Sequence, residues 1–479
     1  MKKYAFLLAL VFVIPLCLVG CGQEVKLSSY NIVCEYDENA HTLKAEQTVC
    51  YVNNSDNTLN EVCFFLYPNS FKEVAVSNAY LERAYPNGES FGEIDIESIK
   101  IGETSAEFEI ENDAILNVSL LNSLFPNESV EIDISYVVTL ANINHRLGYG
   151  ENTINFGNFY PILCVYDNGF VKNPFASNGD PFYSDVANYN VEITYSSSFT
   201  LASSGDILDS QTTNSKTTTK IVGEKIRDFC FVLSDKFEVI SSDINGVNVN
   251  YYYYDDENAE EYLTLSCEVI EEFSSLFGDY PYKNINVVKT NFCFGGMEYP
   301  NLVYISDEIS DVETYRYVIV HELAHQWWYS LVGNNEYEEA WLDESLTEYS
   351  TALFFERHDF GLNYDDIING AYNTYSMFVD VYTNITGDCD ESMNRNLSEF
   401  QTEPEYVNCV YTKGVLMYDS LRKTLGDSKF FKCLQDYFEE YCYKNASGAK
   451  LIDSFSKSSH RNLEGFINSW LDGNVVIGD

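Results

Sequence analysis

The sequence predicts an α+β, multidomain protein in which an antiparallel β-sheet domain precedes a domain of strands and helices. From about residue 30 to residue 240, apolar and mainly polar residues alternate, as along 130–138, which is typical of half-buried strands. Beyond residue 240 the apolar spacing becomes helical, as at Tyr315, Val318 and Ile319. We expect the first domain to be a saddle-like or sandwich-like assembly of sheets.

The first residues have the pattern of an export signal. Lys2 and Lys3 precede a mostly apolar run over 4–19, which is short and interrupted by Pro15 and therefore poorly suited to span a membrane. The run closes with Leu-Val-Gly-Cys at Cys21, which resembles the lipobox of bacterial lipoproteins. That resemblance implies lipidation of Cys21 and an extracytoplasmic protein anchored to the bacterial cell membrane. The alternative is an ordinary cleaved signal followed by an incidental cysteine.

The chain of 479 residues is long enough for two or three domains, each with its own core. We find no internal repeat and no low-complexity linker. The predicted organisation is a lipoprotein signal peptide over 1–20, a tether over 21–28, a β-rich domain over 29–240 and a catalytic domain over 241–479.

Charge and cysteine spacing exclude several classes of function. A formal net charge of −46 repels nucleic acid and anionic lipid headgroups, so we expect neither as a partner. The same charge favours cationic ligands, including free peptide amines. The 13 cysteines contain no Cys-x-x-Cys pair, so neither a cysteine zinc site nor a thioredoxin-like centre is expected. Without Cys17 and Cys21 their number is odd, and at least one is not paired within the chain.

The second half opens with strands and continues mainly as helices. Ser310 and Glu313 have the spacing of a capping box, which marks the start of a helix, while Gly333 and Gly426 are typical of helix ends. The elements expected here are strands near 247–253, 286–289 and 302–306, and helices over 310–333, 340–355 and 412–425.

A short histidine motif predicts a metal site on the first of these helices. Residues 321–325 read His-Glu-Leu-Ala-His, and on a helix His321 and His325 present both imidazoles from one face. Catalytic zinc takes three protein ligands and keeps one position open, and Glu344 on the next helix can be the third. Glu322 can accept a proton from an attacking water. The alternative is a buried helix with two core histidines that bind no metal.

Two glycines upstream of this helix predict a place for an extended substrate. Gly295 and Gly296 lie between two expected strands and permit close backbone approach, as an edge strand that binds a peptide requires. Glu298, after Met297, would then direct its carboxylate into the cleft. An ordinary loop is the alternative interpretation of these four residues.

Taken together, these motifs resemble those of the M1 zinc aminopeptidases, or gluzincins. The two histidines are followed after eighteen residues by Glu344, as in that family. Gly295–Glu298 is similar to the family's exopeptidase motif, and Tyr411-Thr412-Lys413-Gly414 matches the Tyr-x-x-Gly block that holds its catalytic tyrosine. The resemblance is good from about residue 150 to residue 479, and over 30–150 it is only architectural.

The resemblance implies a small two-domain member with a thermolysin-like α+β zinc peptidase domain. It implies one Zn²⁺ ion, a catalytic Glu322, a Tyr411 hydroxyl that stabilises the oxyanion, and a Glu298 that pairs with the free amine of a peptide substrate. Tyr299 departs from the pattern, because the family usually has asparagine there. The N-terminal glutamine that helps to hold the substrate amine in larger members has no clear counterpart, and their helical C-terminal domain is not expected.

Other polar residues near the motifs have simpler interpretations. Glu348, one turn beyond Glu344, either orients a ligand histidine or occupies a solvated helix position. The remaining histidines have no ligand-like spacing and are interpreted as structural or surface residues; they are His41, His145, His358 and His460.

The sequence therefore predicts a zinc-dependent aminopeptidase that removes N-terminal amino acids from peptides. One alternative is a thermolysin-like metalloendopeptidase, but such enzymes place the third ligand one residue further on and lack the Gly-Gly-Met-Glu block. Another is a non-catalytic, surface-binding lipoprotein on a relict peptidase fold. Glu322 and Tyr411 argue against it, because neither is needed merely to hold zinc.

Overall fold

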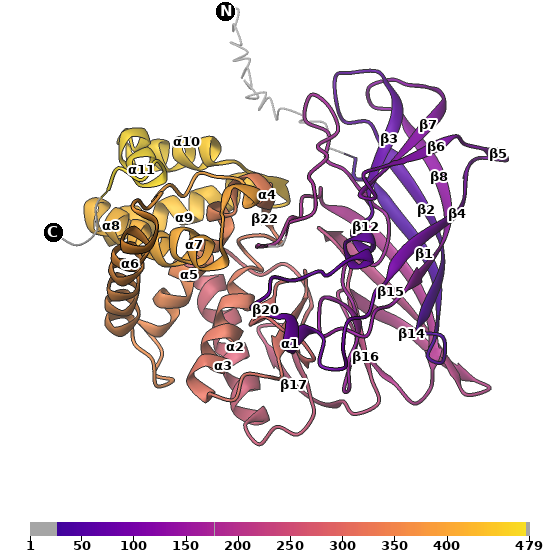
Figure 1. Ribbon diagram of the computed structural model, residues 1–479, viewed down its shortest axis with the longest axis horizontal. Helices are drawn as coiled ribbons and strands as arrows, with labels where there is room; N and C mark the ends of the chain where they lie inside the picture. The colour runs from indigo at the N-terminus through magenta and orange to yellow at the C-terminus, as the bar shows by residue number, and fades with distance from the viewer. Residues whose placement is uncertain (1–25, 177, 476–479) are drawn as a thin grey trace, which may run out of the picture.

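The structure is a computed structural model that describes residues 26–176 and 178–475. The predicted signal peptide and the lipidation site at Cys21 lie outside the described residues. Figure 1 shows a β-sheet half and a half rich in helices side by side. The expected α+β class, with the β-rich part first, is confirmed.

An eight-stranded sheet forms the outer wall of the β half. Its strands alternate between buried and exposed residues, as along β1, so one face is buried. Neighbouring strands are antiparallel except β1 and β12, which pair in parallel with Ile32 opposite Val191. In sheet order the strands are β14 (Asp206–Thr213), β15 (Lys216–Ile226), β12 (Ala187–Ser196), β1 (Ser29–Asp37), β2 (Thr42–Val52), β8 (Ser129–Thr139), β4 (Glu93–Ile101) and β5 (Thr104–Ser105).

Two four-stranded sheets and two short helices complete this half. Aromatic rings fill the core between the sheets; Tyr30 stacks on Tyr189 at 4.6 Å, and Phe156 stacks on Phe231 at 4.2 Å. One sheet has the order β13 (Thr200–Ser203), β16 (Phe231–Ser234), β10 (Ile154–Phe156) and β9 (Leu147–Tyr149). The other has the order β11 (Ile162–Leu163), β3 (Leu59–Phe65), β7 (Ile115–Leu124) and β6 (Phe108–Glu111), and the helices are η1 (Tyr67–Lys72) and α1 (Leu81–Ala84).

The second half begins with a five-stranded mixed sheet whose edge strand faces the site. Its order is β17 (Glu238–Ile244), β18 (Val247–Tyr253), β19 (Asn284–Thr290), β21 (Leu302–Ser306) and β20 (Gly296–Met297). Helices α2 (Ala259–Leu276) and α3 (Val312–Ala324) pack against it. Since β20 is the edge, the edge strand expected at the two glycines is present. The sheet begins at Glu238, and the domain boundary near residue 240 stays a prediction.

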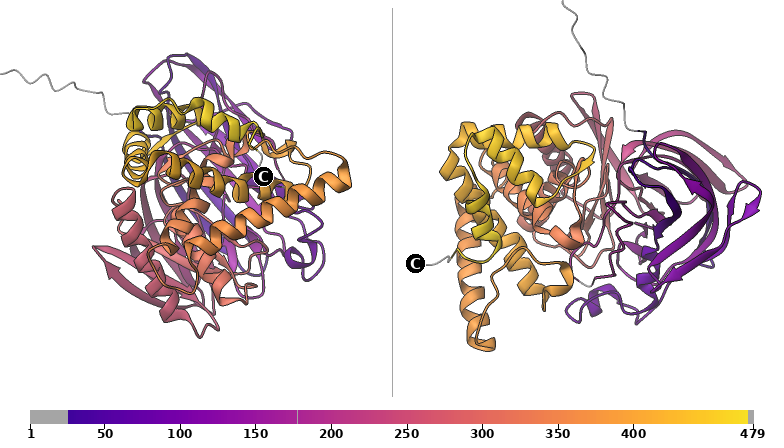
Figure 2. Two further views of the ribbon diagram at one scale, coloured as in Figure 1. Left: turned by 90° about the vertical axis from the view of Figure 1, so that its left-hand side faces the viewer. Right: turned by 90° about the horizontal axis from the view of Figure 1, so that it is seen from above.

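Helices make up the rest of this half. In α5 (Trp341–Phe355) every residue except Glu348 is buried, so this helix is the centre of the bundle. Figure 2 shows the long helix α6 (Tyr364–Thr386) on the outside. The other elements are α4 (Glu336–Glu339), η2 (Leu397–Glu399), α7 (Glu403–Val407), the π-helix η3 (Asn408–Thr412), α8 (Lys413–Leu425), α9 (Asp427–Tyr441), α10 (Gly448–Ser459), α11 (Glu464–Leu471) and the parallel pair β22 (Val332–Gly333) and β23 (Lys444–Asn445).

The metal-site helix is shorter than the sequence pattern predicts. Its N-cap is Asp311, whose carboxylate accepts a hydrogen bond from the Thr314 amide at 2.8 Å, so the expected box at Ser310 is wrong. The helix ends at Ala324 rather than at Gly333, because the chain turns there to bury two tryptophans. Gly333 lies in β22 instead, where a Cβ atom would overlap the guanidinium of Arg227.

Arg227 and Asp228 join the two halves of the molecule. The buried Arg227 guanidinium donates to the carbonyl of Tyr329 at 2.7 Å and to the side chain of Asn445 at 2.5 Å. The Tyr329 hydroxyl in turn donates to the Asp228 carboxylate. These contacts link the end of β15 to the turn that follows the metal-site helix, and they fix the β half against the site.

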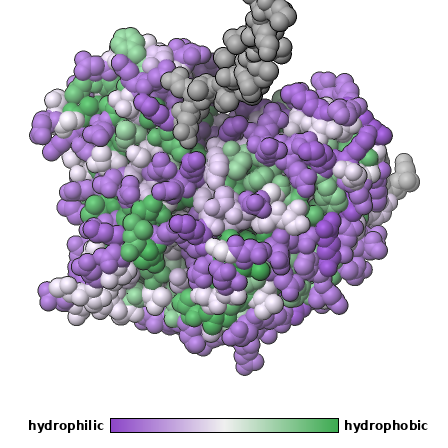
Figure 3. Space-filling model, turned by 180° about the vertical axis from the view of Figure 1, so that it is seen from behind, coloured by the Kyte–Doolittle hydropathy of each residue, from purple (hydrophilic) through white to green (hydrophobic). Residues whose placement is uncertain are grey.

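One face of the molecule is mainly polar. Hydrophilic side chains cover most of the face in Figure 3, and hydrophobic ones form separate patches. Within the described part of the chain, no helix has the length and apolar character needed to cross a membrane. All eleven cysteines in that part are free thiols.

Candidate active site

Three side chains from two helices converge on one point. His321 lies in the last turn of α3, His325 caps its C-terminus, and Glu344 lies in the first turn of α5. The Nε2 atoms of the two histidines are 3.2 Å apart, and the Glu344 Oε2 atom is 3.3 Å from the first and 3.2 Å from the second. The structure thus brings together the three predicted ligands.

Hydrogen bonds at the Nδ1 atom of each ring determine which nitrogen carries the proton and which is available to bind a metal ion. The Nδ1 atom of His321 is 2.8 Å from a carboxylate oxygen of Glu348, and that of His325 is 3.0 Å from the Trp328 carbonyl. Both partners only accept, so each neutral ring carries its proton on Nδ1 and presents a lone pair at Nε2. Two lone pairs and a carboxylate that face one another repel unless a cation lies between them.

The triangle also has the dimensions that a zinc ion requires. Zinc binds nitrogen and oxygen ligands at about 2.0–2.2 Å, which places tetrahedral ligands roughly 3.3–3.6 Å apart. The observed spacings of 3.2–3.3 Å are close to that range. His321, His325 and Glu344 therefore fit one zinc ion.

The electrostatics of these buried groups favour positive charge at the centre. Burial alone would lower the pKa of His325, but the carboxylates of Glu344 and Glu298 raise it to about 10. Burial alone would raise the pKa of Glu344, yet His325 and His321 hold it well below the usual range. A cation bound by the three ligands would supply this positive charge in place of the histidine protons.

Glu322 lies between the metal ligands and the edge strand. Burial raises the pKa of its carboxyl to about 7, and its Oε2 atom has no hydrogen-bond partner among the described residues. A Cβ atom on Gly296 would overlap the Glu322 carboxylate. Glycine at position 296 thus lets β20 approach the side chain that is placed to accept a proton.

Glu298 places a second buried carboxylate near His325. It follows β20, is buried, and its Oε1 atom lacks a hydrogen-bond partner within the described structure. Burial raises its pKa well above the ordinary value, and the negative charges of Asp180, Glu322 and Glu344 add to that rise. Of the other motif residues, Met297 lies in the core, and the Gly295 carbonyl accepts from the amide of Ser306 at 3.0 Å.

Tyr411 completes the predicted set from the helical bundle. It lies in the π-helix η3, and π-turns are frequent at functional sites. Its hydroxyl donates to Oε1 of Glu344 at 2.5 Å, and its ring stacks on His321 with centroids 6.0 Å apart. Burial raises the pKa of the phenol, so the hydroxyl keeps its proton and can donate a hydrogen bond.

Tyr299, which replaces the family's asparagine, points away from the metal ligands. It is fully buried, and its hydroxyl donates to Oδ1 of Asn158 in the β half at 2.7 Å. A Cβ atom on Gly157 would overlap that hydroxyl, so the pairing requires glycine at position 157.

Several groups near the site could not be found from motifs. Glu348 orients His321, so the first of the two interpretations of Glu348 is the correct one. No sequence pattern identifies the Trp328 carbonyl as the partner of His325. Asp180 and Arg146 come from loops of the β half, where no motif marks them. None of the remaining four histidines joins the cluster; His358, for example, pairs with Glu268 at 2.9 Å.

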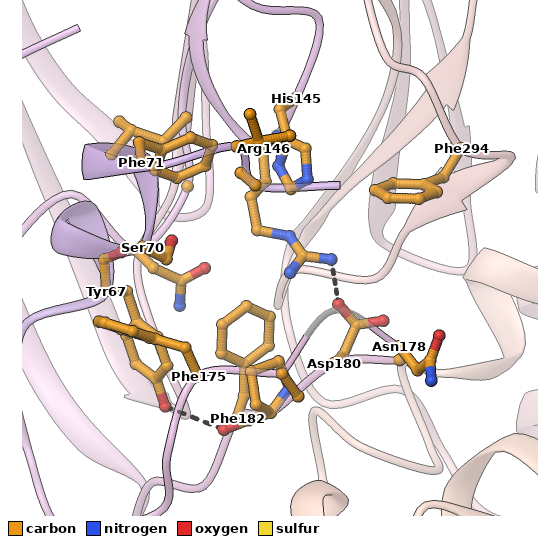
Figure 4. Close-up of a pocket in the computed structure, with 18 of the residues that line it drawn as sticks. Tyr67, Ser70, Phe71, His145, Arg146, Phe175, Asn178, Asp180, Phe182 and Phe294 are labelled. Atoms are coloured by element: carbon orange, nitrogen blue, oxygen red, sulfur yellow. Dashed lines mark hydrogen bonds and ion pairs between the residues drawn. The ribbon is translucent and has the colours of Figure 1, made fainter. Parts of the chain in front are cut away.

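A cavity of about 550 Å³ opens beside β20, between the two halves. Figure 4 shows Arg146 projecting into it and pairing with Asp180, with Phe182 close to the guanidinium. Gly296 and Tyr406 border the cavity on the side of the metal ligands.

Comparison with known proteins agrees with this geometry. The model of the peptidase family M1 domain matches residues 262–470. Aminopeptidase N from Lactococcus lactis is 28% identical over 234 residues, covering 45% of this chain and 27% of that protein. A probable aminopeptidase 2 from Sulfurisphaera tokodaii is 26% identical over 238 residues, covering 45% of this chain and 29% of its own length. The chain thus matches less than a third of each relative.

Solved structures share the fold over nearly the whole chain. The crystal structure of an M1 zinc metallopeptidase from Deinococcus radiodurans superposes with a TM-score of 0.67 at 16% identity, covering 94% of each chain. A mutant of that protein bound to a Tyr-Ser-Ala substrate gives a TM-score of 0.68 at 16% identity, again covering 94% of each chain. These matches indicate one zinc ion as the cofactor, in agreement with the three-ligand cluster. Residues 262–470 of this chain are therefore a peptidase family M1 domain, joined to a β half in the fold of the two-domain M1 zinc metallopeptidases.

Proposed function

We propose that this protein is a zinc-dependent aminopeptidase that removes N-terminal amino acids from peptides. The observation that carries the proposal is the buried carboxylate of Glu298, which has no hydrogen-bond partner among the described residues and lies beside the metal ligands. A protonated α-amine would supply the missing partner. The aminopeptidase names of the relatives and the tripeptide bound by the Deinococcus mutant support the same substrate class.

His321, His325 and Glu344 would hold the zinc ion, which supplies the Lewis acidity that makes a water nucleophilic near neutral pH. Glu322 accepts the proton of the attacking water on its carboxylate and passes it to the leaving amine. The Tyr411 hydroxyl donates to the oxyanion as it forms. An oxyanion donor of this kind is worth about 2.7–4 kcal/mol in the transition state.

The edge strand and Glu298 position the peptide. β20 has an unpaired edge to which an extended substrate backbone can add as a further strand. Pairing of the substrate amine with Glu298 then fixes the first peptide bond over the metal, because the amine cannot move further along the cleft. Cleavage is thereby restricted to the N-terminal residue.

Hydrolysis of aminoacyl amides, with and without a chelator, tests this proposal. We expect the purified protein to release amines from alanyl and leucyl amides, to lose that activity with 1,10-phenanthroline and to regain it with Zn²⁺. His321→Ala should retain little zinc by metal analysis, whereas exposed Lys423→Ala should retain all of it. Full zinc occupancy in His321→Ala, or activity that resists the chelator, contradicts the assignment.

We further propose that lipid on Cys21 anchors the protein outside the cytoplasm, with no other membrane contact and no nucleic-acid partner. The charged and apolar pattern of residues 1–21 and the net charge of −46 support this. Cys21→Ser should move the protein from the detergent phase to the aqueous phase with its specific activity unchanged. Detergent partitioning that persists in the variant contradicts the anchor.

A further inference from the structure

We propose that the cavity beside β20 receives the side chain of the peptide's first residue and that Arg146 makes it selective for large aromatic side chains. This inference rests on the proposed aminopeptidase function and names the substrates that such an enzyme prefers. It draws on four features of the cavity: its position, its walls, the stacking of Arg146 and the charges around it.

The cavity adjoins the groups assigned to catalysis. Gly296, whose backbone lies against Glu322, forms part of its lining. Tyr406 lines it as well, and the Tyr406 ring packs edge-on against Tyr411 with centroids 5.6 Å apart. A peptide that pairs with β20 and binds Glu298 through its amine therefore has its first side chain beside this opening.

Several aromatic rings line the cavity. Figure 4 shows Tyr67, Phe71, Phe175, Phe182 and Phe294 around the space. The volume of about 550 Å³ is within the range of pockets that hold small molecules, so even the largest natural side chain fits. Rings that line a cavity favour another ring by edge-to-face or offset contact.

Arg146 supplies the group that discriminates among apolar side chains. Its guanidinium carbon lies 5.0 Å from the centroid of the Phe182 ring, and Asp180 accepts from one of its nitrogens. The Arg146 side chain is 14% exposed, and in Figure 4 it projects into the cavity. One face of the guanidinium thus packs on Phe182, and the other can stack on a substrate ring.

The cavity disfavours both acidic and cationic side chains of the substrate. A carboxylate would approach Asp180 and Glu403, while Asp180 already neutralises Arg146 and Asp113 pairs with Lys72. A cationic side chain would meet Arg146 and Lys72, and the carboxylates that pair with these two residues are already engaged. Neutral rings, as in phenylalanine, tyrosine and tryptophan, avoid both costs and add the stacking contact.

The test measures kcat/KM of the zinc-loaded, full-length enzyme for phenylalanyl, tryptophanyl, alanyl, leucyl, glutamyl and arginyl amides of one fluorophore. We expect the two aromatic substrates to exceed the alanyl substrate by about tenfold. Arg146→Met should remove most of that ratio. Because it leaves Asp180 without its partner, Arg146→Met/Asp180→Asn is measured in parallel, together with Arg146→Lys, which keeps the charge but loses the planar stack.

The matched control is Arg357→Met, since Arg357 also packs on a ring, that of Phe431 at 5.3 Å, and pairs with Glu272, but lies away from the cavity. Its substrate ratios should equal those of the native enzyme. A native preference for glutamyl, arginyl or small aliphatic substrates overturns the inference, as does an equal loss on all substrates in every folded Arg146 variant. In either case, chelator-sensitive hydrolysis of any amide leaves the aminopeptidase proposal standing, whereas hydrolysis of none defeats that proposal itself.

Discussion

His321 and His325 are prepared for metal binding by the acceptors behind their rings. Glu348 and the Trp328 carbonyl each accept a hydrogen bond from a histidine Nδ1 atom, so both Nε2 atoms face the same point. Partners of this kind fix the orientation of a ligand ring and raise its basicity. The Tyr317 hydroxyl donates to the other Glu348 oxygen at 2.6 Å, which holds that carboxylate in place.

At the residue scale, Glu322→Gln should lower turnover without removing the metal ion. The amide cannot accept the proton of the attacking water, so kcat should fall by about 10²–10⁴-fold while zinc content stays at one equivalent. Metal analysis and turnover of an alanyl amide on one preparation measure both quantities. Glu313→Gln, an exposed change on the same helix, should be neutral in both. Near-native turnover in Glu322→Gln would remove this residue from the mechanism.

At the scale of elements, the site depends on the close approach of strand β20 to helix α3. The strand is only Gly296–Met297, yet it places the edge of the sheet against Glu322 and carries Glu298 into the cleft. A side chain at position 296 would push the strand and the helix apart. The glycine therefore has a steric role at this contact.

Gly296→Ala should reduce kcat/KM by about 100-fold, because a displacement on the order of 1 Å misplaces both the substrate strand and Glu322. Zinc content should be unchanged, since no ligand contacts the new methyl group. Gly370→Ala is the matched control, because a Cβ atom there meets nothing within 4 Å. If kinetic assays find Gly296→Ala as active as this control, the close-approach argument is wrong.

The sequence predicts this site well where spacing along one element determines geometry. The pair His321 and His325 shares a helix face, and Gly296 lies on an edge strand, as expected, while Gly295 directly precedes that strand. The end of the metal-site helix is not predictable from local signals, because burial of Trp327 and Trp328 turns the chain before Gly333. Long-range partners such as the cavity residues Arg146 and Asp180 come together only through tertiary packing, which no local pattern records.

At the scale of the molecule, the two halves meet at a junction that contains a buried acid. Asp228 is fully enclosed, and burial raises its pKa to about 6, although Tyr329 and Arg227 oppose the rise. An acid with a raised pKa in the folded state stabilises the fold fully only below its unfolded pKa. That contribution is lost as pH rises through the folded value.

Asp228→Asn should therefore change the pH dependence of stability. The free energy of unfolding of the variant relative to native protein should increase between about pH 4 and pH 6 and stay constant above, with a gain on the order of 3 kcal/mol. Urea denaturation at a series of pH values measures this difference. The exposed Asp95→Asn, measured in parallel, is the matched control. A difference that is flat or falls with pH would show that the Asp228 carboxyl does not titrate as described.

Substrate recognition takes place in the cleft between the halves, where the β half lies beside the catalytic groups. Glu298 contributes a buried carboxylate that has neither a metal role nor a proton-transfer role, and its Oε1 atom has no hydrogen-bond partner among the described residues. An amine that pairs with it satisfies the carboxylate, whereas an acetylated terminus leaves it desolvated and unpaired, at a cost of several kcal/mol. Recognition of the free terminus is thus the central claim of the account.

The most direct test compares hydrolysis of one peptide with its N-acetylated form by the zinc-loaded enzyme, with products identified by mass spectrometry. We expect sequential loss of N-terminal residues from the free peptide and at least a 100-fold lower rate for the acetylated one. Glu298→Ala should lower kcat/KM for the free peptide by about tenfold or more and narrow the gap between the two peptides. Efficient internal cleavage of the acetylated peptide by the native enzyme would contradict the account and identify an endopeptidase.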